Sequence, residues 1–157
     1  MQKLRVLFWV GLVISLVSGS ADADVAMLKN ECQATCMAAA EMVKTQGIAA
    51  AMCEINNRSG QFVKGDIYVY MMNMDAVMMA HPMVPTLIGK NLSGMVLKDI
   101  HGKEQPMMLV NFAKDRGAGW ISYMWPKPGT KKAVEKMCYI LKVPDTNVFV
   151  VAGFFVE

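Results

Sequence analysis

The stretch Asp66-Ile67-Tyr68-Val69-Tyr70-Met71-Met72 decides the fold class, because its side chains alternate between two sides of the chain. β-Branched and aromatic residues at a period of two indicate a β-strand. The next residues, Asn73-Met74-Asp75-Ala76, predict a turn. Val77–Ala80 then predicts a returning strand that ends at Pro82, since proline cannot donate to a sheet.

Three more strands are expected towards the C-terminus. In order, the sequence predicts a loop over His81–Gly102, a short helix over Glu104–Lys114, and strands over Trp120–Trp125, Val134–Leu141 and Val148–Val156. Short connections between successive strands favour antiparallel pairing.

On the N-terminal side of these strands, apolar residues recur every three or four positions from Val25 to Gln46, which indicates one face of a helix. Asp24 is a suitable N-cap and Gly47 a suitable end. A second helix is expected over Ile48–Ile55. The sequence therefore predicts an α+β fold, with a five-stranded antiparallel sheet preceded by a long N-terminal helix.

Residues 1–23 have the three parts of a secretory signal peptide: a basic start, a short apolar run and the ending Ala21-Asp22-Ala23. The alternative is an uncleaved segment that anchors the chain to a membrane. We expect a periplasmic or secreted protein, divided into a signal peptide (1–23), a helical region (24–59) and a sheet domain (60–157).

Composition excludes several classes of protein. With 157 residues the chain is long enough for one domain, and a net charge of +3 is too small to indicate nucleic-acid binding. The sequence has no Gly-x-Ser-x-Gly nucleophile motif, and Gly117-Ala118-Gly119 precedes a strand rather than the helix of a phosphate loop. We therefore expect no enzyme activity and no cofactor.

Export would place the four cysteines in an oxidising compartment, where disulfides form. They are Cys32, Cys36, Cys53 and Cys138. A bridge from the helical region to Cys138 and small buried thiols are equally good interpretations, and the pairing stays open. No histidine lies at zinc-ligand spacing from any of them.

Several ordered motifs make the stretch Gly60–Phe155 similar to a single Cache domain, the extracellular sensor module of bacterial chemoreceptors and histidine kinases. They are Gln61–Tyr68, Ala80-His81-Pro82, Leu87–Leu92, Lys98-Asp99 with Gly102-Lys103, Gly119-Trp120 with Tyr123, Trp125-Pro126, Cys138-Tyr139 and Val151-Ala152-Gly153. The resemblance implies a PAS-like sheet with a small-ligand pocket on one face, which in this family often takes short carboxylates.

The same resemblance bears on how a binding signal would be transmitted. A receptor of this family continues into a membrane helix and a signalling domain, whereas the given sequence ends at Glu157. We expect a ligand-binding module that works with a separate membrane receptor or transporter, and that contacts the membrane only if the signal segment is kept.

A carboxylate pocket needs charge-assisted donors and aromatic walls. The candidates are Tyr68, Tyr70, His81, Trp120, Tyr123, Lys136 and Tyr139. Lys136 is the best cation because it lies within a strand pattern, although a charge that protects an edge strand is an alternative. Trp120 and Tyr123 have opposite parity in an unbroken strand, as do Lys136 and Tyr139, so all four can line one pocket only if a bulge intervenes.

The methionines offer a rival function, because thioethers beside histidine suit Cu(I) in an exported protein. Met71, Met72, Met74, Met78, Met79 and Met83 surround His81 in the sequence. Most of them lie on expected strands and are explained as core packing. Met74, Met83 and His81 keep the strongest claim to a copper role, and a structural partner with an empty pocket is a third possibility.

Overall fold

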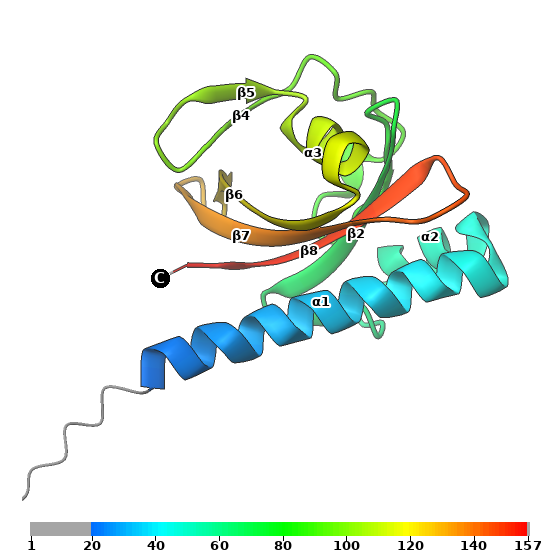
Figure 1. Ribbon diagram of the computed structural model, residues 1–157, viewed down its shortest axis with the longest axis horizontal. Coiled ribbons are helices and arrows are strands. Elements are labelled where there is room, and N and C mark those ends of the chain that lie inside the picture. Colours follow the sequence, from blue (N-terminus) through cyan, green and yellow to red (C-terminus); the bar gives the residue numbers. More distant parts are fainter. Residues whose placement is uncertain (1–19, 157) are drawn as a thin grey trace, which may run out of the picture.

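The computed structural model describes residues 20–156, which form three layers (Figure 1). Two helices lie on one side of a curved antiparallel sheet, and a third helix with a small two-stranded sheet lies on the other. The expected signal peptide falls almost wholly on residues 1–19, outside the described residues. Within residues 20–156 we find no helix that combines the length and the apolarity needed to cross a membrane.

The main sheet has six strands in the order β1-β2-β8-β7-β6, and β3 pairs with the same edge of β2 as β1, opposite β8. The strands are β1 (Val63–Lys64), β2 (Ile67–Asn73), β3 (Met78–Ala80), β6 (Ala118–Pro126), β7 (Ala133–Lys142) and β8 (Val148–Phe155). All five strands expected from the sequence are therefore present, together with the short β1. Each paired neighbour runs antiparallel.

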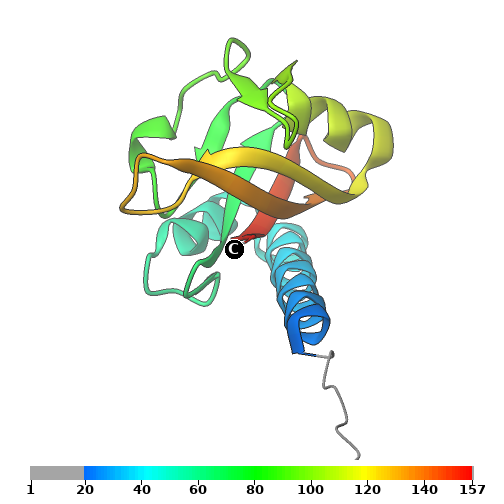
Figure 2. The ribbon, with the colours of Figure 1, turned by 90° about the vertical axis from the view of Figure 1, so that its left-hand side faces the viewer.

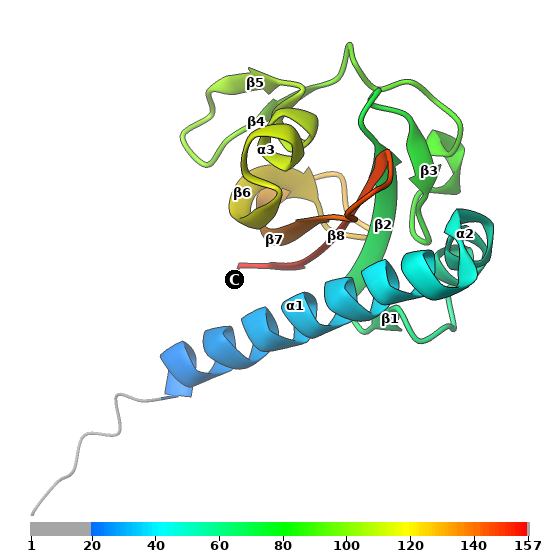
Figure 3. The same cartoon turned by 45° about the vertical axis from the view of Figure 1, so that its right-hand side comes forward.

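Helix α1 (Ser20–Gln46) runs along one face of the sheet, and Figure 2 looks almost along its axis. Its 27 residues span about 40 Å. Its described part includes Ser20–Asp24, which precede the expected start at Val25, and it ends as expected before Gly47, whose φ of 88° suits glycine. Helix α2 (Ile48–Asn56) follows directly and lies next to β2 and β3 (Figure 3).

The layer on the opposite face differs from the sequence prediction. The expected loop over 81–102 contains a 3₁₀ turn (Pro85–Leu87) and β4 (Val96–Lys98). The expected helix over 104–114 begins instead with β5 (Glu104–Pro106), which pairs with β4, and α3 runs from Met108 to Arg116. These strands of three residues are too short for a periodic pattern to reveal them.

Alternation along the strands creates two cores. We call the side that packs on α1 the helix face; it carries Ile67, Val69 and Met71 of β2. The cavity face, which packs on α3 and β4, carries Tyr68 and Tyr70. Strand β8 is buried on both faces, as expected for a strand in the middle of a three-layer structure.

The four cysteines are free thiols. Cys32 and Cys36 belong to the core under α1, whereas Cys138 belongs to the core on the cavity face. Because the sheet separates the two groups, the expected bridge from the helical region to Cys138 is not formed, and the alternative of buried thiols describes these three residues. Cys53 is exposed on α2.

Candidate ligand-binding cavity

Five of the seven candidate residues lie on the cavity face: Tyr68, Tyr70, His81, Tyr123 and Lys136. The other two, Trp120 and Tyr139, lie on the helix face, where their rings pack 5.2 Å apart, so they do not line the inner cavity described below. The register between β6 and β7 is unbroken from 118 to 126, so no bulge turns these two rings towards the cavity.

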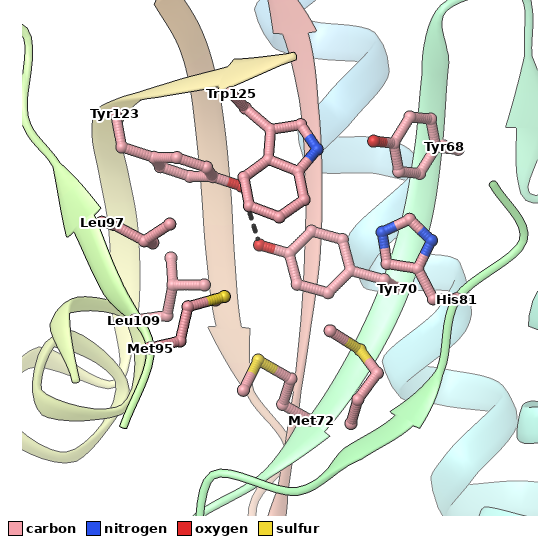
Figure 4. A pocket seen from close by; sticks show the side chains of 10 residues that line it. Tyr68, Tyr70, Met72, His81, Met95, Leu97, Leu109, Tyr123 and Trp125 are labelled. Carbon is pink, nitrogen blue, oxygen red and sulfur yellow. Dashed lines mark hydrogen bonds between the residues drawn. The ribbon is translucent and has the colours of Figure 1, made fainter. Parts of the chain in front are cut away.

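An inner cavity lies between the sheet, β4 and α3 (Figure 4). The side chains that line it are those of Tyr68, Tyr70, Met72, Met78, His81, Met95, Leu97, Leu109, Tyr123 and Trp125. Its volume is about 20 Å³, which admits one or two waters, since one water needs roughly 10–15 Å³. The cavity is therefore closely packed, with aromatic and imidazole groups at one end and thioethers and leucines at the other.

Lys136 is the group that packing alone does not explain. Its side chain is 0% exposed, and its Nζ is the one buried side-chain nitrogen or oxygen among the described residues without a hydrogen-bond partner. Nζ lies 3.8 Å from the ring centroid of Tyr68 and 5.2 Å from that of Phe155. Strand β7 lies between β6 and β8, so the interpretation of Lys136 as an edge-strand charge is wrong.

His81 is held in place from several sides. Its backbone N–H donates to Asn56 Oδ1 (3.0 Å), and its Nδ1 accepts from the N–H groups of Met83 (3.2 Å) and Val84 (2.9 Å). The ring stacks on Tyr70 with centroids 5.3 Å apart. Burial, assisted by the nearby Lys136 ammonium, lowers the pKa of His81 to about 4. The imidazole is therefore neutral at pH 7, and because Nδ1 accepts, its proton resides on Nε2.

Two tyrosine hydroxyls meet inside the cavity. Tyr70 Oη and Tyr123 Oη are 3.0 Å apart (Figure 4). The Cys138 thiol donates to Tyr123 Oη at 3.5 Å. Burial raises the pKa of both tyrosines well above the usual value, so both hydroxyls keep their protons. One shared hydrogen bond uses only one of the two protons, which leaves the other hydroxyl hydrogen for a ligand.

Six of the ten lining residues are not among the candidates that the sequence suggests. Trp125 shares its strand face with Tyr123, so parity alone could have found it. Met72 and Met78 were assigned to packing, and they do line the cavity while also belonging to its core. Met95, Leu97 and Leu109 lie in segments whose strand or helix boundaries the pattern did not define, so no signal pointed to them.

A second, distal cavity adjoins the inner one. Its lining side chains are all apolar: Met72, Ala76, Leu92, Met95, Leu97, Met107, Met108, Leu109 and Val110. It measures about 10 Å³ and shares Met72, Met95, Leu97 and Leu109 with the inner cavity. These four side chains are thus the partition between the two spaces.

The methionines near His81 in sequence do not gather at one point. Met71 and Met79 pack in the core under α1, whereas Met72, Met74, Met78 and Met83 pack on the cavity face. The sheet separates the two groups, because neighbouring strand residues point to opposite sides. The set of six that motivated a copper site is therefore divided.

An open groove leads away from the aromatic end of the inner cavity. It has a volume of about 350 Å³ and shares Tyr68 and Trp125 with the cavity. Arg58 and Lys127 line it, and Lys127 forms an ion pair with Asp66 at 3.1 Å. The groove thus presents two basic side chains outside the rings that close the cavity.

Comparison with known proteins gives one consistent result. The sequence model of a family described as the Cache domain matches residues 50–157. The methyl-accepting chemotaxis protein McpP of Pseudomonas putida is 29% identical over 92 residues, which are 59% of this chain and 16% of that receptor. The chain therefore spans only a small part of the length of this curated relative.

Solved structures show the same fold. One of them is a Cache chemosensory domain whose structure is described as explaining carboxylic acid recognition. It has a TM-score of 0.70 and 23% identity, over 88% of this chain and 100% of that one. A periplasmic sensor domain of a chemotaxis protein has a TM-score of 0.64 and 24% identity, over 86% and 94%. A methyl-accepting chemotaxis protein from Vibrio parahaemolyticus has a TM-score of 0.63 and 20% identity, over 87% and 90%.

Proposed function

Since the chain belongs to the Cache domain family, we propose that it is an extracytoplasmic sensor module that binds a small monocarboxylate in its inner cavity. One observation carries this proposal: the Lys136 ammonium is fully buried beside the cavity and has no hydrogen-bond partner. The carboxylic acid recognition described for a structural neighbour points to the same chemistry.

The energetics favour an anionic ligand. An unpaired buried charge costs several kcal/mol, whereas a cation–π contact returns only about 0.5–2 kcal/mol. The rings of Tyr68 and Phe155 therefore do not compensate for the desolvation of Lys136. A carboxylate would supply both a counter-charge and acceptors for the three ammonium protons.

The other polar groups of the cavity suit the same ligand. The Nε2–H of His81 and one hydroxyl hydrogen of the Tyr70–Tyr123 pair are donors, and a carboxylate is an acceptor on both oxygens. With His81 neutral, Lys136 contributes the only positive charge among these groups, which favours a monocarboxylate. In the outer groove Arg58 would attract anions towards the entrance, whereas the charge of Lys127 is compensated by Asp66.

A matched pair of ligands tests this proposal. Propionate and propionamide have nearly the same shape, but only the acid carries a negative charge. We expect calorimetric titration to show binding of propionate and none of the amide at the same concentration. Equal binding of the two would contradict a charge-based site. Stoichiometric Cu(I) binding, with no response to any acid, would favour the copper alternative.

Two further parts of the proposal concern the cellular setting. We propose that residues 1–23 direct export to the periplasm or the medium, and that the module reports to a separate membrane receptor or transporter. N-terminal sequencing of the exported protein would test the first, since we expect the chain to begin at Asp24. A protein retained at its original N-terminus would contradict it. Cross-linking in cells, followed by mass spectrometry, would identify the partner.

A further inference from the structure

We propose that the acid recognised by this site carries an apolar tail, which extends past the methionine partition into the distal cavity. This inference rests on the proposed function, because it assumes that the carboxylate lies near Lys136. The domain would then prefer straight-chain acids longer than propionate. The inference depends on the polarity of the two ends of the site, their continuity and the adaptability of the partition.

Strand β2 fixes the direction of the ligand. Tyr68, Tyr70 and Met72 follow one another on the cavity face, and at about 3.3 Å per residue the first and last are about 13 Å apart along the strand. Lys136 Nζ lies over the ring of Tyr68, at the polar end. Met72 lies at the other end, where it belongs to both cavities. A ligand held by its carboxylate at Lys136 thus points its tail towards the distal cavity.

The distal cavity has the chemistry of a tail site. No side chain in its lining carries a charge or a hydrogen-bonding nitrogen or oxygen, so a second polar group of the ligand would find only main-chain partners there. No cation is present in this lining to offset the desolvation of a second carboxylate. An alkyl chain would instead gain from the burial of its surface.

The partition can open because it is partly made of methionine. Met72 and Met95 separate the two cavities, and Met107 and Met108 form part of the far wall. Methionine has three rotatable side-chain bonds and a polarisable sulfur, so it repacks around ligands at low cost. The two cavities measure only about 20 and 10 Å³, because the methionine side chains occupy the space that a ligand tail would take.

The experiment is a calorimetric series of acetate, propionate, valerate, hexanoate and octanoate with three variants of the protein. Met108 lines the distal cavity and not the inner one, so Met108→Trp adds bulk at the tail site and Met108→Ala enlarges it. Lys114→Trp adds the same bulky group to an exposed position of α3 and serves as the control. The folding of each variant is checked by its unfolding transition without ligand.

We expect affinity to rise beyond propionate by on the order of fourfold per methylene, the effect of burying one CH₂ group. Met108→Trp should remove this gain, so that the longer acids lose far more affinity than propionate does, and Lys114→Trp should change the affinity of neither. Affinity that falls beyond propionate, or a gain that survives Met108→Trp, would overturn the tail site and leave the carboxylate proposal intact. If no acid of any length binds, both proposals fail.

Discussion

Replacing Lys136 by methionine should abolish acid binding and stabilise the empty protein. Methionine keeps the length and apolar character of the lysine stem but carries no charge. In the ligand-free protein the ammonium is buried without a hydrogen-bond partner. Its removal eliminates a desolvation penalty of several kcal/mol and a cation–π contribution of about 0.5–2 kcal/mol. We therefore expect the free energy of unfolding to rise by about 1–3 kcal/mol.

The ligand should cancel or reverse most of this difference in stability. At a concentration one hundred times its Kd, propionate would stabilise the wild-type protein by about 2.7 kcal/mol, and the variant by nothing. Urea unfolding with and without propionate, followed by tryptophan fluorescence, measures both effects in one set of curves. Lys142→Met, an exposed position on the same strand, is the control and should leave both quantities nearly unchanged.

Two results would refute this reasoning. If Lys136→Met unfolds more than about 2 kcal/mol more easily without ligand, Lys136 supports the fold through its packing and its aromatic contacts. If the variant is stabilised by propionate as much as the wild-type protein, the carboxylate lies elsewhere. Unchanged behaviour of Lys142→Met in either case would show that the effect belongs to the buried position.

Four other substitutions test further parts of the site and of its packing. Burial is the main cause that lowers the pKa of His81 to about 4. As pH falls, the unfolded chain therefore takes up a proton on this imidazole before the folded protein does. The free energy of unfolding of the wild-type protein should fall by up to about 3 kcal/mol between pH of about 6.5 and 4. His81→Asn keeps an acceptor at the Nδ1 position, and denaturation at several pH values should show a smaller loss; an identical loss would remove His81 as its source. Gly153→Ala should reduce the free energy of unfolding by about 1–3 kcal/mol, because the added Cβ would collide with Cys138 Sγ, and an unchanged urea midpoint would contradict this close contact. Trp125→Ala should weaken propionate binding at least tenfold. Trp120→Ala should lower the free energy of unfolding but keep the Kd for propionate within twofold. The reverse pattern would show that the two faces of β6 are assigned wrongly.

The sequence predicted the architecture well because the long elements have clear periods. Strands β2, β7 and β8 alternate or are continuously apolar over seven to ten residues, and α1 repeats its apolar residues over many turns. The segment from His81 to Met107 could not be predicted in the same way. Its strands β4 and β5 have three residues each, and their position depends on contacts with distant parts of the chain.

The residues of the candidate site could also be predicted only in part. Parity in a regular strand already required that Trp120 and Tyr123 lie on opposite faces, and the structure shows which of the two faces the cavity. What periodicity could not supply was the identity of that face, since aromatic residues occur on both. That choice depends on where α1 packs, which is a tertiary contact.

The status of Lys136 depended on a further tertiary fact, the order of the strands. A lysine on an edge strand extends its ammonium into water, whereas on an interior strand it must be buried or must lie in a cavity. Strand β7 has neighbours on both sides, Tyr123 of β6 and Phe155 of β8 at the level of Lys136. The same residue was therefore ambiguous in the sequence and becomes the most informative one in the structure.

Strand β7 also connects the cavity with the long helix by alternate residues. Lys136 and Cys138 face the cavity side, whereas Met137 and Tyr139 pack against the core under α1. The Cys36 thiol of α1 donates to the carbonyl oxygen of Tyr139 at 3.5 Å. Because interiors are close-packed, a shift of β7 that brings Lys136 towards a bound anion must also alter the contact with α1. A ligand held by Lys136 would therefore act on the residue next to Met137, which packs against the core under α1.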